Sequence, residues 1–193
     1  MNDAAPVFLQ TPLCKEDVVR LRTGDRVFLS GVLYTARDVA HRRLVERMDL
    51  GESLPMELEG QVIYFAGPSP SRPGQATGSI GPTTSYRMDP YSPRLMERGL
   101  RGMIGKGRRS KDVREALQRF GAAYFGATGG AGALLARAVE KVEIVAFEDL
   151  GPEAIRRLWV KDFPVVVIND AHGGDLYEEG LAEFRKAQAS GSR

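Results

Sequence analysis

The sequence is poor in the side chains that build disulfides and metal centres. Its 193 residues include one cysteine, Cys14, and two histidines. A single thiol forms no internal disulfide, and one copy of the chain completes neither a zinc site nor an iron–sulfur cluster with several thiolate ligands. Any such centre therefore belongs to another chain. Cys14 itself has no evident charged partner in the sequence to activate it, so we expect a small buried hydrophobic residue.

Long apolar runs are also absent. No run approaches the roughly 18 residues that a membrane span needs, so we expect no membrane partner. The first ten residues carry Asp3 and lack the basic stretch and apolar core of a secretory signal, which favours a cytoplasmic protein. The formal net charge is only +2, and the basic residues of the chain are interspersed with acidic ones, which argues against nucleic-acid binding. The densest basic cluster, residues 108–111 (RRSK), is typical of a solvated helix start.

The overall composition predicts one globular domain over residues 1–193. Hydrophobic residues make up 42% and charged residues 27% of the chain, as in soluble globular proteins. The length fits a single domain, since domains commonly have about 100–200 residues. No internal repeat or clear linker divides the sequence.

Local patterns predict an α/β domain with a mixed, partly parallel sheet. Predicted strands cover residues 26–34, 61–66, 101–105, 122–125, 142–147 and 164–168. Predicted helices cover residues 38–48, 93–98, 110–119, 128–135, 152–158 and 176–189. Ser30-Gly31 interrupts the first strand, which is therefore two short strands or one bent strand with a bulge. The alternation of strands and helices in the second half supports parallel pairing.

The segment 81–91 (GPTTSYRMDPY) has the features of a binding loop. Pro82 and Pro90 fix the backbone φ angle and remove two N–H donors, so the residues between them are held in a shaped turn. Those residues include three consecutive hydroxyls and an arginine: Thr83, Thr84, Ser85 and Arg87. Hydroxyls donate hydrogen bonds to anions, and a guanidinium grips a carboxylate or phosphate with two parallel bonds. The alternative is an ordinary Ser/Thr-rich surface turn.

Three cationic side chains lie where loops meet the ends of predicted strands: Arg37, Arg87 and Lys106. Such junctions commonly bind ligands in α/β sheets. Together with the hydroxyls of the 81–91 loop, the three cations suit a small dicarboxylate, with one arginine for each carboxylate and the lysine as a third charge. Taken singly, each cation is more often a surface residue.

Both histidines and one glycine-rich stretch are further candidates. His41 follows Arg37 by four residues and shares a helical face with it, where it orients Asp38 or the substrate, or is simply a capping or partly buried residue. His172 follows the predicted 164–168 strand and ranks below the arginines. Residues 128–132 (TGGAG) either contact a phosphate or allow close helix packing.

Three ordered motifs carry a resemblance to a known family. Residues 81–89 (GPTTSYRMD), 36–41 (ARDVAH) and 103–107 (MIGKG) resemble class I fumarate hydratases, in the region of their C-terminal domain or separate beta subunit. The resemblance spans nearly the whole chain. Tartrate dehydratase beta subunits are similar, but residues 87–91 and 100–106 are closer to fumarases.

This resemblance implies a hydro-lyase that adds water reversibly to fumarate to give (S)-malate, in a domain with a swivelling β/β/α fold. It implies that a 4Fe-4S cluster is carried by a partner, the fumarase alpha subunit, in a hetero-oligomer. It also implies substrate-binding roles for Arg37, Thr83, Thr84, Arg87 and Lys106. Thr83 is the candidate base at the reacting carbon, and Asp38 and His41 are further catalytic candidates. Tyr86 stands where a smaller residue is expected, which leaves the choice between fumarate and a bulkier hydroxy acid open.

Two other functions compete with the fumarase hypothesis. One is the beta subunit of an L(+)-tartrate dehydratase, which is an enzyme of the same class. The other is an anion-binding module without catalysis, which the scarcity of acid and base groups besides the two histidines supports.

Overall fold

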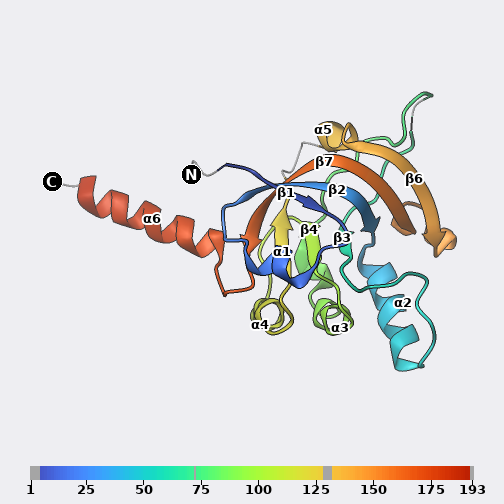
Figure 1. Cartoon of the computed structure of the whole chain (residues 1–193), viewed down its shortest axis with the longest axis horizontal. Coiled ribbons are helices and arrows are strands. Elements are labelled where there is room, and N and C mark those ends of the chain that lie inside the picture. The colour runs from blue at the N-terminus through green and yellow to red at the C-terminus, as the bar shows by residue number, and fades with distance from the viewer. Residues whose placement is uncertain (1–4, 72, 128–131, 192–193) are drawn as a thin grey trace.

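A closed five-stranded barrel forms the centre of the fold. The computed structural model describes residues 5–71, 73–127 and 132–191. Its strands follow the order β1-β2-β3-β4-β5-β7-β6, and β2 also pairs with β7, which closes β2, β3, β4, β5 and β7 into the barrel (Figure 1). The strands are β1 Val7–Gln10, β2 Arg26–Thr35, β3 Val62–Tyr64, β4 Gly102–Gly105, β5 Ala123–Gly126, β6 Val139–Ala146 and β7 Ile155–Asn169.

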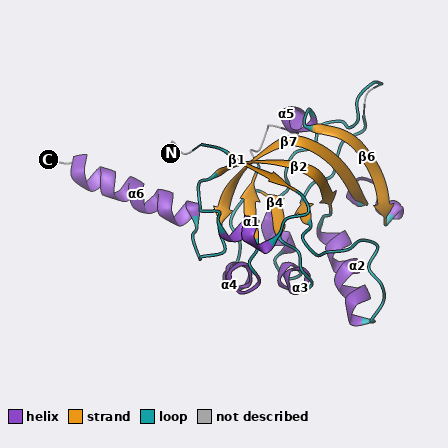
Figure 2. Cartoon of the chain, viewed as in Figure 1, coloured by secondary structure: helices purple, strands orange, loops and turns teal. Residues whose placement is uncertain are grey.

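Helices surround the barrel and extend from it. They are α1 Lys15–Val19, α2 Asp38–Asp49, α3 Ser92–Glu97, α4 Lys111–Phe120, α5 Gly132–Ala136 and α6 Leu176–Gly191, with short 3-10 helices η1 Ser85–Met88 and η2 Glu148–Glu153. Helices α3 and α4 lie side by side against the barrel, whereas α6 projects away from the body of the molecule (Figure 2).

Strand direction gives the barrel two distinct ends. Strands β2, β3, β4 and β5 run parallel to one another, and β7 runs antiparallel to both β5 and β2. The last residues of the four parallel strands, Thr35, Tyr64, Gly105 and Gly126, therefore mark one end, which we call the carboxyl end of the barrel. The prediction of a mixed, partly parallel sheet is confirmed.

Two hydrophobic clusters hold this arrangement together. One is drawn mainly from strand residues such as Leu33, Tyr64 and Phe125. The other joins strand residues, including Phe65, to α2, α3 and α4 through residues such as Leu44. Tyr64 and Phe65 are neighbours in sequence but belong to different clusters, because successive side chains of an extended chain point to opposite faces. Burial on both faces explains why these strands are nearly continuous apolar runs.

The bent-strand alternative for residues 26–34 is confirmed. Strand β2 is one element whose pairing with β7 shifts register between Leu29 and Gly31. The prediction of a helix at 152–158 is wrong, because η2 ends at Glu153 and β7 begins at Ile155. This part of β7 pairs with β2 on one side and β6 on the other, as when Leu158 faces both Leu33 and Val142. Pairing on both edges outweighs the local helix preference.

Two other expectations concern segments described only in part. Of the predicted helix at 128–135, the structure describes residues from Gly132 onward, which form α5. The glycine-rich stretch proposed for phosphate contact, residues 128–132, lies outside the described residues except for Gly132. Within the described ranges, no helix combines the length and the apolar character needed to cross a membrane.

Truncation of a barrel core residue tests the packing. Leu33 is fully buried, so Leu33→Ala removes buried methyl groups and leaves a cavity, with an expected loss of about 2–5 kcal/mol in the free energy of unfolding. Leu50→Ala is the matched control, because Leu50 is 74% exposed and its truncation should change stability by less than about 0.5 kcal/mol. Urea denaturation of both variants measures the difference, and equal losses would contradict the assigned core.

Candidate functional site

Backbone bonds fix the 81–91 loop to the carboxyl end of the barrel. The Thr83 N–H donates to Phe65 O at 2.7 Å, and the Ser85 N–H donates to Lys106 O at 2.9 Å. Thr84 and Lys106 also form an isolated parallel bridge. Gly105 permits this close approach, because a Cβ at that position would collide with the Ser85 hydroxyl. The structure thus brings Thr83, Thr84 and Lys106, which are distant in sequence, to the same end of the sheet.

The three loop hydroxyls have different surroundings. Thr83 is partly exposed, and its Oγ1 donates to Phe65 O at 2.7 Å, so the oxygen keeps its lone pairs for a further partner. Thr84 is also partly exposed. Ser85 is fully buried, and its Oγ lies 2.9 Å from the Tyr124 hydroxyl. That hydroxyl donates to Gly107 O, so Ser85 must be the donor to Tyr124. Ser85 therefore faces the interior and serves the loop structure.

Two arginines at this end are each paired with a carboxylate. Arg37 precedes α2 directly, and its Nη2 lies 2.9 Å from Glu153 Oε1. Arg87 donates through Nη2 to Asp38 Oδ1 at 2.6 Å. The Arg87–Asp38 contact joins the 81–91 loop to the start of α2. The structure therefore brings together Arg37, Asp38 and Arg87, as the sequence predicted, and adds Glu153, which sequence reasoning missed.

The pairing determines the charge state of Asp38. Burial raises the pKa of this carboxyl, but the hydrogen bond from Arg87 and a backbone N–H outweigh burial, and the pKa is held below its ordinary value. The same hydrogen bond raises the pKa of Arg87. Asp38 is thus ionised at neutral pH and stabilises the position of the Arg87 guanidinium.

Lys106 completes the group of cations. Its side chain is exposed and has no ion-pair partner within the described ranges. The cavities of about 520 Å³ found in the described structure are lined by other residues, including Ser69, Thr77 and Arg137 in one and Tyr34 and Glu57 in another. Lys106 is exposed and Arg37, Arg87, Thr83 and Thr84 are partly exposed, so the cations and hydroxyls form a solvent-accessible surface at the end of the barrel. Chemically, this surface can accept a small anion with more than one carboxylate.

His41 lies beneath this surface, in a fully buried position in the first turn of α2. Its Nδ1 is 2.9 Å from Arg37 O, and its ring packs edge-on against Phe65 at 5.2 Å. Burial lowers the pKa of His41 from 6.5 to about 4, so the ring is neutral at pH 7. A carbonyl only accepts hydrogen bonds, so Nδ1 carries the proton. His41 therefore holds the backbone of Arg37.

Arg109 is a buried residue that the sequence analysis missed. The expected solvated helix start at 108–111 is wrong for this position, since the Arg109 side chain is 0% exposed. Its Nε donates to Asp89 Oδ1 at 2.6 Å and its Nη2 to Ser92 Oγ at 2.7 Å. The guanidinium also lies 4.9 Å from the centre of the Tyr124 ring. Four consecutive polar residues give no local sign that one of them is buried.

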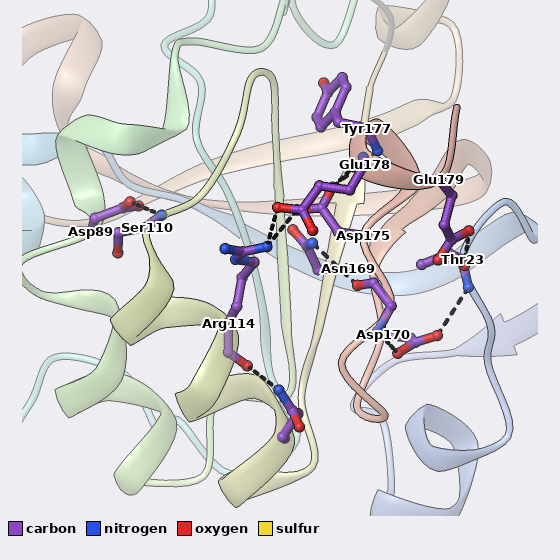
Figure 3. Close-up of polar contacts among 12 residues, drawn as sticks. Thr23, Asp89, Ser110, Arg114, Asn169, Asp170, Asp175, Tyr177, Glu178 and Glu179 are labelled. Carbon is purple, nitrogen blue, oxygen red and sulfur yellow. Dashed lines mark hydrogen bonds and ion pairs between the residues drawn. The ribbon is translucent and has the colours of Figure 1, made fainter. Parts of the chain in front are cut away.

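The ion pair between Arg109 and Asp89 is also connected to the start of α4. Asp89 Oδ2 accepts the Ser110 N–H at 2.6 Å (Figure 3). Ser110 is the N-cap of α4, as its place at the start of the predicted 110–119 helix suggested, and its Oγ accepts from Val113 N. One carboxylate thus joins the loop after β3 to the loop and helix after β4.

His172 lies at the other end of the barrel. Asn169, the last residue of β7, pairs with Tyr124 near the start of β5, and β5 runs parallel to β4. His172 therefore follows β7 at the amino end of the parallel strands, where its Nε2 lies 2.6 Å from Val19 O. The structure does not bring His172 together with the cations at the carboxyl end.

The turn that contains His172 is a structural network (Figure 3). Asp170 Oδ1 accepts N–H groups from His172 and Gly174, each at 2.9 Å, and Asp170 Oδ2 accepts the Thr23 N–H. Close by, Arg114 of α4 contacts both Asp175 and Glu178 at the start of α6. The polar residues of this turn are therefore used to attach β7 and α6 to the rest of the fold.

Cys14 is exposed, so the expectation of a buried residue is wrong. Its thiol donates to Asp17 Oδ2 at 3.1 Å, and this hydrogen bond raises the pKa of the thiol. The residue precedes α1, where it can cap the helix. Across the described ranges, no cluster of three or more histidine, cysteine, aspartate or glutamate side chains could hold a metal ion.

Sequence comparison identifies the family of this domain. Residues 1–180 match the family described as "Fumarase C-terminus". The chain belongs to the fumarase C-terminal domain family. It is 40% identical over 180 residues to fumarate hydratase 2 of Leishmania major, an alignment that covers 91% of this chain and 32% of that protein. It is 39% identical over 183 residues to the aerobic class I fumarate hydratase of Escherichia coli, covering 92% of this chain and 33% of that protein.

A second kind of relative has a different length. The protein named "Putative L(+)-tartrate dehydratase subunit beta" of Methanocaldococcus jannaschii is 40% identical over 173 residues, covering 86% of this chain and 89% of that protein. The chain thus spans about a third of the fumarate hydratases that it matches and nearly all of this subunit.

The buried His41 predicts a dependence of stability on pH. Its pKa is 6.5 when unperturbed and about 4 in the fold, so between these values the unfolded chain binds a proton that the folded chain does not. The free energy of unfolding should therefore fall as the pH drops from about 6.5 to about 4, by on the order of 3 kcal/mol. Urea unfolding measured across this pH range should show that the free energy of unfolding depends less steeply on pH in His41→Gln than in wild type. An NMR titration with a His41 midpoint near 6.5 would contradict the prediction.

Proposed function

We propose that this chain is the beta subunit of a two-subunit class I fumarate hydratase, which hydrates fumarate reversibly to (S)-malate. In this proposal residues 1–193 form one domain with the swivelling β/β/α fold of the family, and the enzyme works in the cytoplasm. Family membership supports the hydro-lyase class, and the match to nearly the full length of a beta subunit supports the separate chain. The single observation that carries the proposal is the grouping of Arg37, Arg87 and Lys106 with two partly exposed hydroxyls at one end of the barrel.

The proposed roles follow from charge and hydrogen bonding. Arg37 and Arg87 would each bind one carboxylate, with Lys106 and Thr84 as further donors. Removal of a proton beside a carboxylate creates a dianionic aci-carboxylate, so cations fixed at that carboxylate lower the barrier where charge develops. Thr83 is the proposed base, and the lone pairs on its Oγ1 are consistent with that role.

Asp38 and His41 complete the proposed catalytic group as supports for the arginines. Asp38 orients the Arg87 guanidinium through its 2.6 Å hydrogen bond. His41 holds the Arg37 carbonyl, and its neutral state at pH 7 keeps a further charge out of the site.

The iron–sulfur cluster of this enzyme class is assigned to the partner, an alpha subunit. The residues of this chain do not fit such a cluster. Its one thiol, Cys14, is hydrogen-bonded to Asp17, and the described part of the chain has no group of three or more side chains that could ligate a metal. The proposed contribution of this chain is therefore to bind and orient the dicarboxylate.

The beta subunit of an L(+)-tartrate dehydratase is the second candidate. One observation favours it: the tartrate dehydratase relative matches this chain in length and is as similar in sequence as the fumarate hydratases. Tyr86, which is 64% exposed beside Arg87, is a candidate for distinguishing the two substrates.

An anaerobic assay of the chain with its iron–sulfur partner tests the proposal. We expect turnover of fumarate and malate and little turnover of tartrate. A preference for tartrate would establish the second candidate instead. Binding of succinate without turnover of any of the three would support a non-catalytic anion-binding module, and turnover of fumarate by this chain alone would refute the divided site.

Removal of one arginine tests the site within that assay. Arg87→Met should lower kcat/KM by about 100- to 1000-fold, as when a group that stabilises transition-state charge is lost. Arg98→Met is the matched control, since it removes the same charge from an exposed position shortly after the loop and should leave kcat/KM within about twofold. Circular dichroism checks that both variants fold, and equal effects of the two substitutions would contradict the role of Arg87.

A further inference from the structure

Glu153 contacts the site from an element that the motifs do not include. It is the last residue of η2, in the connection between β6 and β7. Its Oε1 lies 2.9 Å from Arg37 Nη2, and the two side chains are 23% and 22% exposed. Glu153 Oε2 and Arg37 Nε are both buried and lack hydrogen-bond partners within the described structure. The pair is thus held by one contact, although both groups could form more.

The β6–β7 connection does not depend on Glu153 for its attachment to α2. Asp149 of η2 accepts two hydrogen bonds from Arg43 of α2, at 2.8 and 2.6 Å. The Arg43 guanidinium also lies 5.2 Å from the centre of the Phe147 ring. This second attachment is one helical turn and a half beyond Arg37 and does not touch the proposed site. The connection is therefore attached at two points, and of these only the Glu153–Arg37 contact includes a residue of the proposed site.

The charges around Arg37 indicate what its contact with Glu153 does. Three cations, Arg37, Arg87 and Lys106, lie beside two carboxylates, Asp38 and Glu153, so the group carries a net charge of +1. A dicarboxylate carries two negative charges, and binding it beside Glu153 costs electrostatic energy. A carboxylate at this position thus weakens binding of the free substrate. It also restrains the guanidinium, whose long side chain is otherwise free to adopt several rotamers.

We propose that Glu153 is a positioning residue for Arg37 in the proposed hydratase site, an inference that rests on the proposed function. Glu153 engages the Nη2 side of the guanidinium and fixes the direction in which its other N–H groups point. An arginine that is already oriented loses less entropy when charge develops on the substrate carboxylate. Glu153 thereby raises turnover at the expense of affinity for the ground state.

Glu153→Gln separates these two effects, because it keeps the shape of the side chain and removes its charge. We expect kcat to fall by about 10- to 100-fold, the size of effect that a misplaced group has. We expect KM, and the dissociation constant for succinate, to fall by about threefold or more, because a repulsive charge is gone. Glu153→Asp keeps the charge but is one methylene shorter, so it should lower kcat without lowering KM. A purely structural role would not make kcat and KM fall together.

Asp149→Asn is the matched control. It removes the same charge from the same connection and breaks the other arginine pair with α2, so kcat and KM should stay within about twofold of wild type. Equal effects of Asp149→Asn and Glu153→Gln would overturn the proposal, because the cause would then be docking or net charge. An unchanged kcat, or a raised KM, in Glu153→Gln would also overturn it.

A measurement without turnover keeps this inference separate from the proposed function. The Arg37 Nε–H is buried, so its NMR signal should exchange slowly with water in the wild-type chain and at least about tenfold faster in Glu153→Gln, but not in Asp149→Asn. If the chain and its partner convert neither fumarate nor tartrate, the proposed function fails. In that case unchanged exchange in Glu153→Gln refutes the positioning of Arg37 as well, whereas faster exchange retains it for an anion-binding site.

Discussion

The buried ion pair between Arg109 and Asp89 is the constraint on which the proposed site depends. Burying two charges is costly unless their pairing and hydrogen bonds are nearly complete, and here the guanidinium also donates to Ser92 while the carboxylate also accepts from Ser110. Both loops must therefore keep one arrangement. Asp89 lies two residues after Arg87, and Arg109 lies three residues after Lys106, so the pair sets the distance between two of the site cations. The Arg109 guanidinium also lies over the rings of Phe65 and Tyr124, at 5.3 and 4.9 Å from their centres, so sliding of one loop past the other would break these contacts as well.

The two ends of the barrel carry different kinds of polar residues. At the carboxyl end, the parallel strands direct three successive loops toward one another, and these loops carry the cations. At the amino end, polar side chains such as that of Asp170 accept hydrogen bonds from backbone N–H groups of the turn and of the segment before β2. Closure by β7 connects the two ends, since this one strand begins beside Glu153 at the carboxyl end and finishes at Asn169 at the other. A change in β7 register would therefore move both the site and the turn.

The sequence predicts the parts of this protein that depend on local signals. The helix at 38–48, the break in the strand at 26–34 and the position of Arg37, Arg87 and Lys106 at strand ends all follow from spacing and from glycine and proline positions, although the sequence does not decide between one bent strand and two short ones at 26–34. Glu153 could not be found in this way, because its partner Arg37 is far away in sequence and the segment 152–158 has helix-forming residues that strand pairing overrides. Arg109 was hidden for a similar reason: its burial depends on Asp89 and two aromatic rings from other elements. In both cases, contacts with residues far away in sequence determine where the side chain lies.

The open position of the site gives a physical reason for a covering partner. Lys106 is exposed and Arg87 is 36% exposed, so a dicarboxylate on this surface meets these charges through water. Two unit charges 4 Å apart attract by about 1 kcal/mol in bulk water and by about 4 kcal/mol at an effective dielectric constant near 20. The cations alone thus provide weak binding and little stabilisation of an aci-carboxylate. Covering the same surface with a second polypeptide removes water and strengthens each contact severalfold without moving any residue of this chain. The proposed division of the site between two chains is therefore consistent with the chemistry of the proposed reaction, since the charges become effective only when the substrate is enclosed.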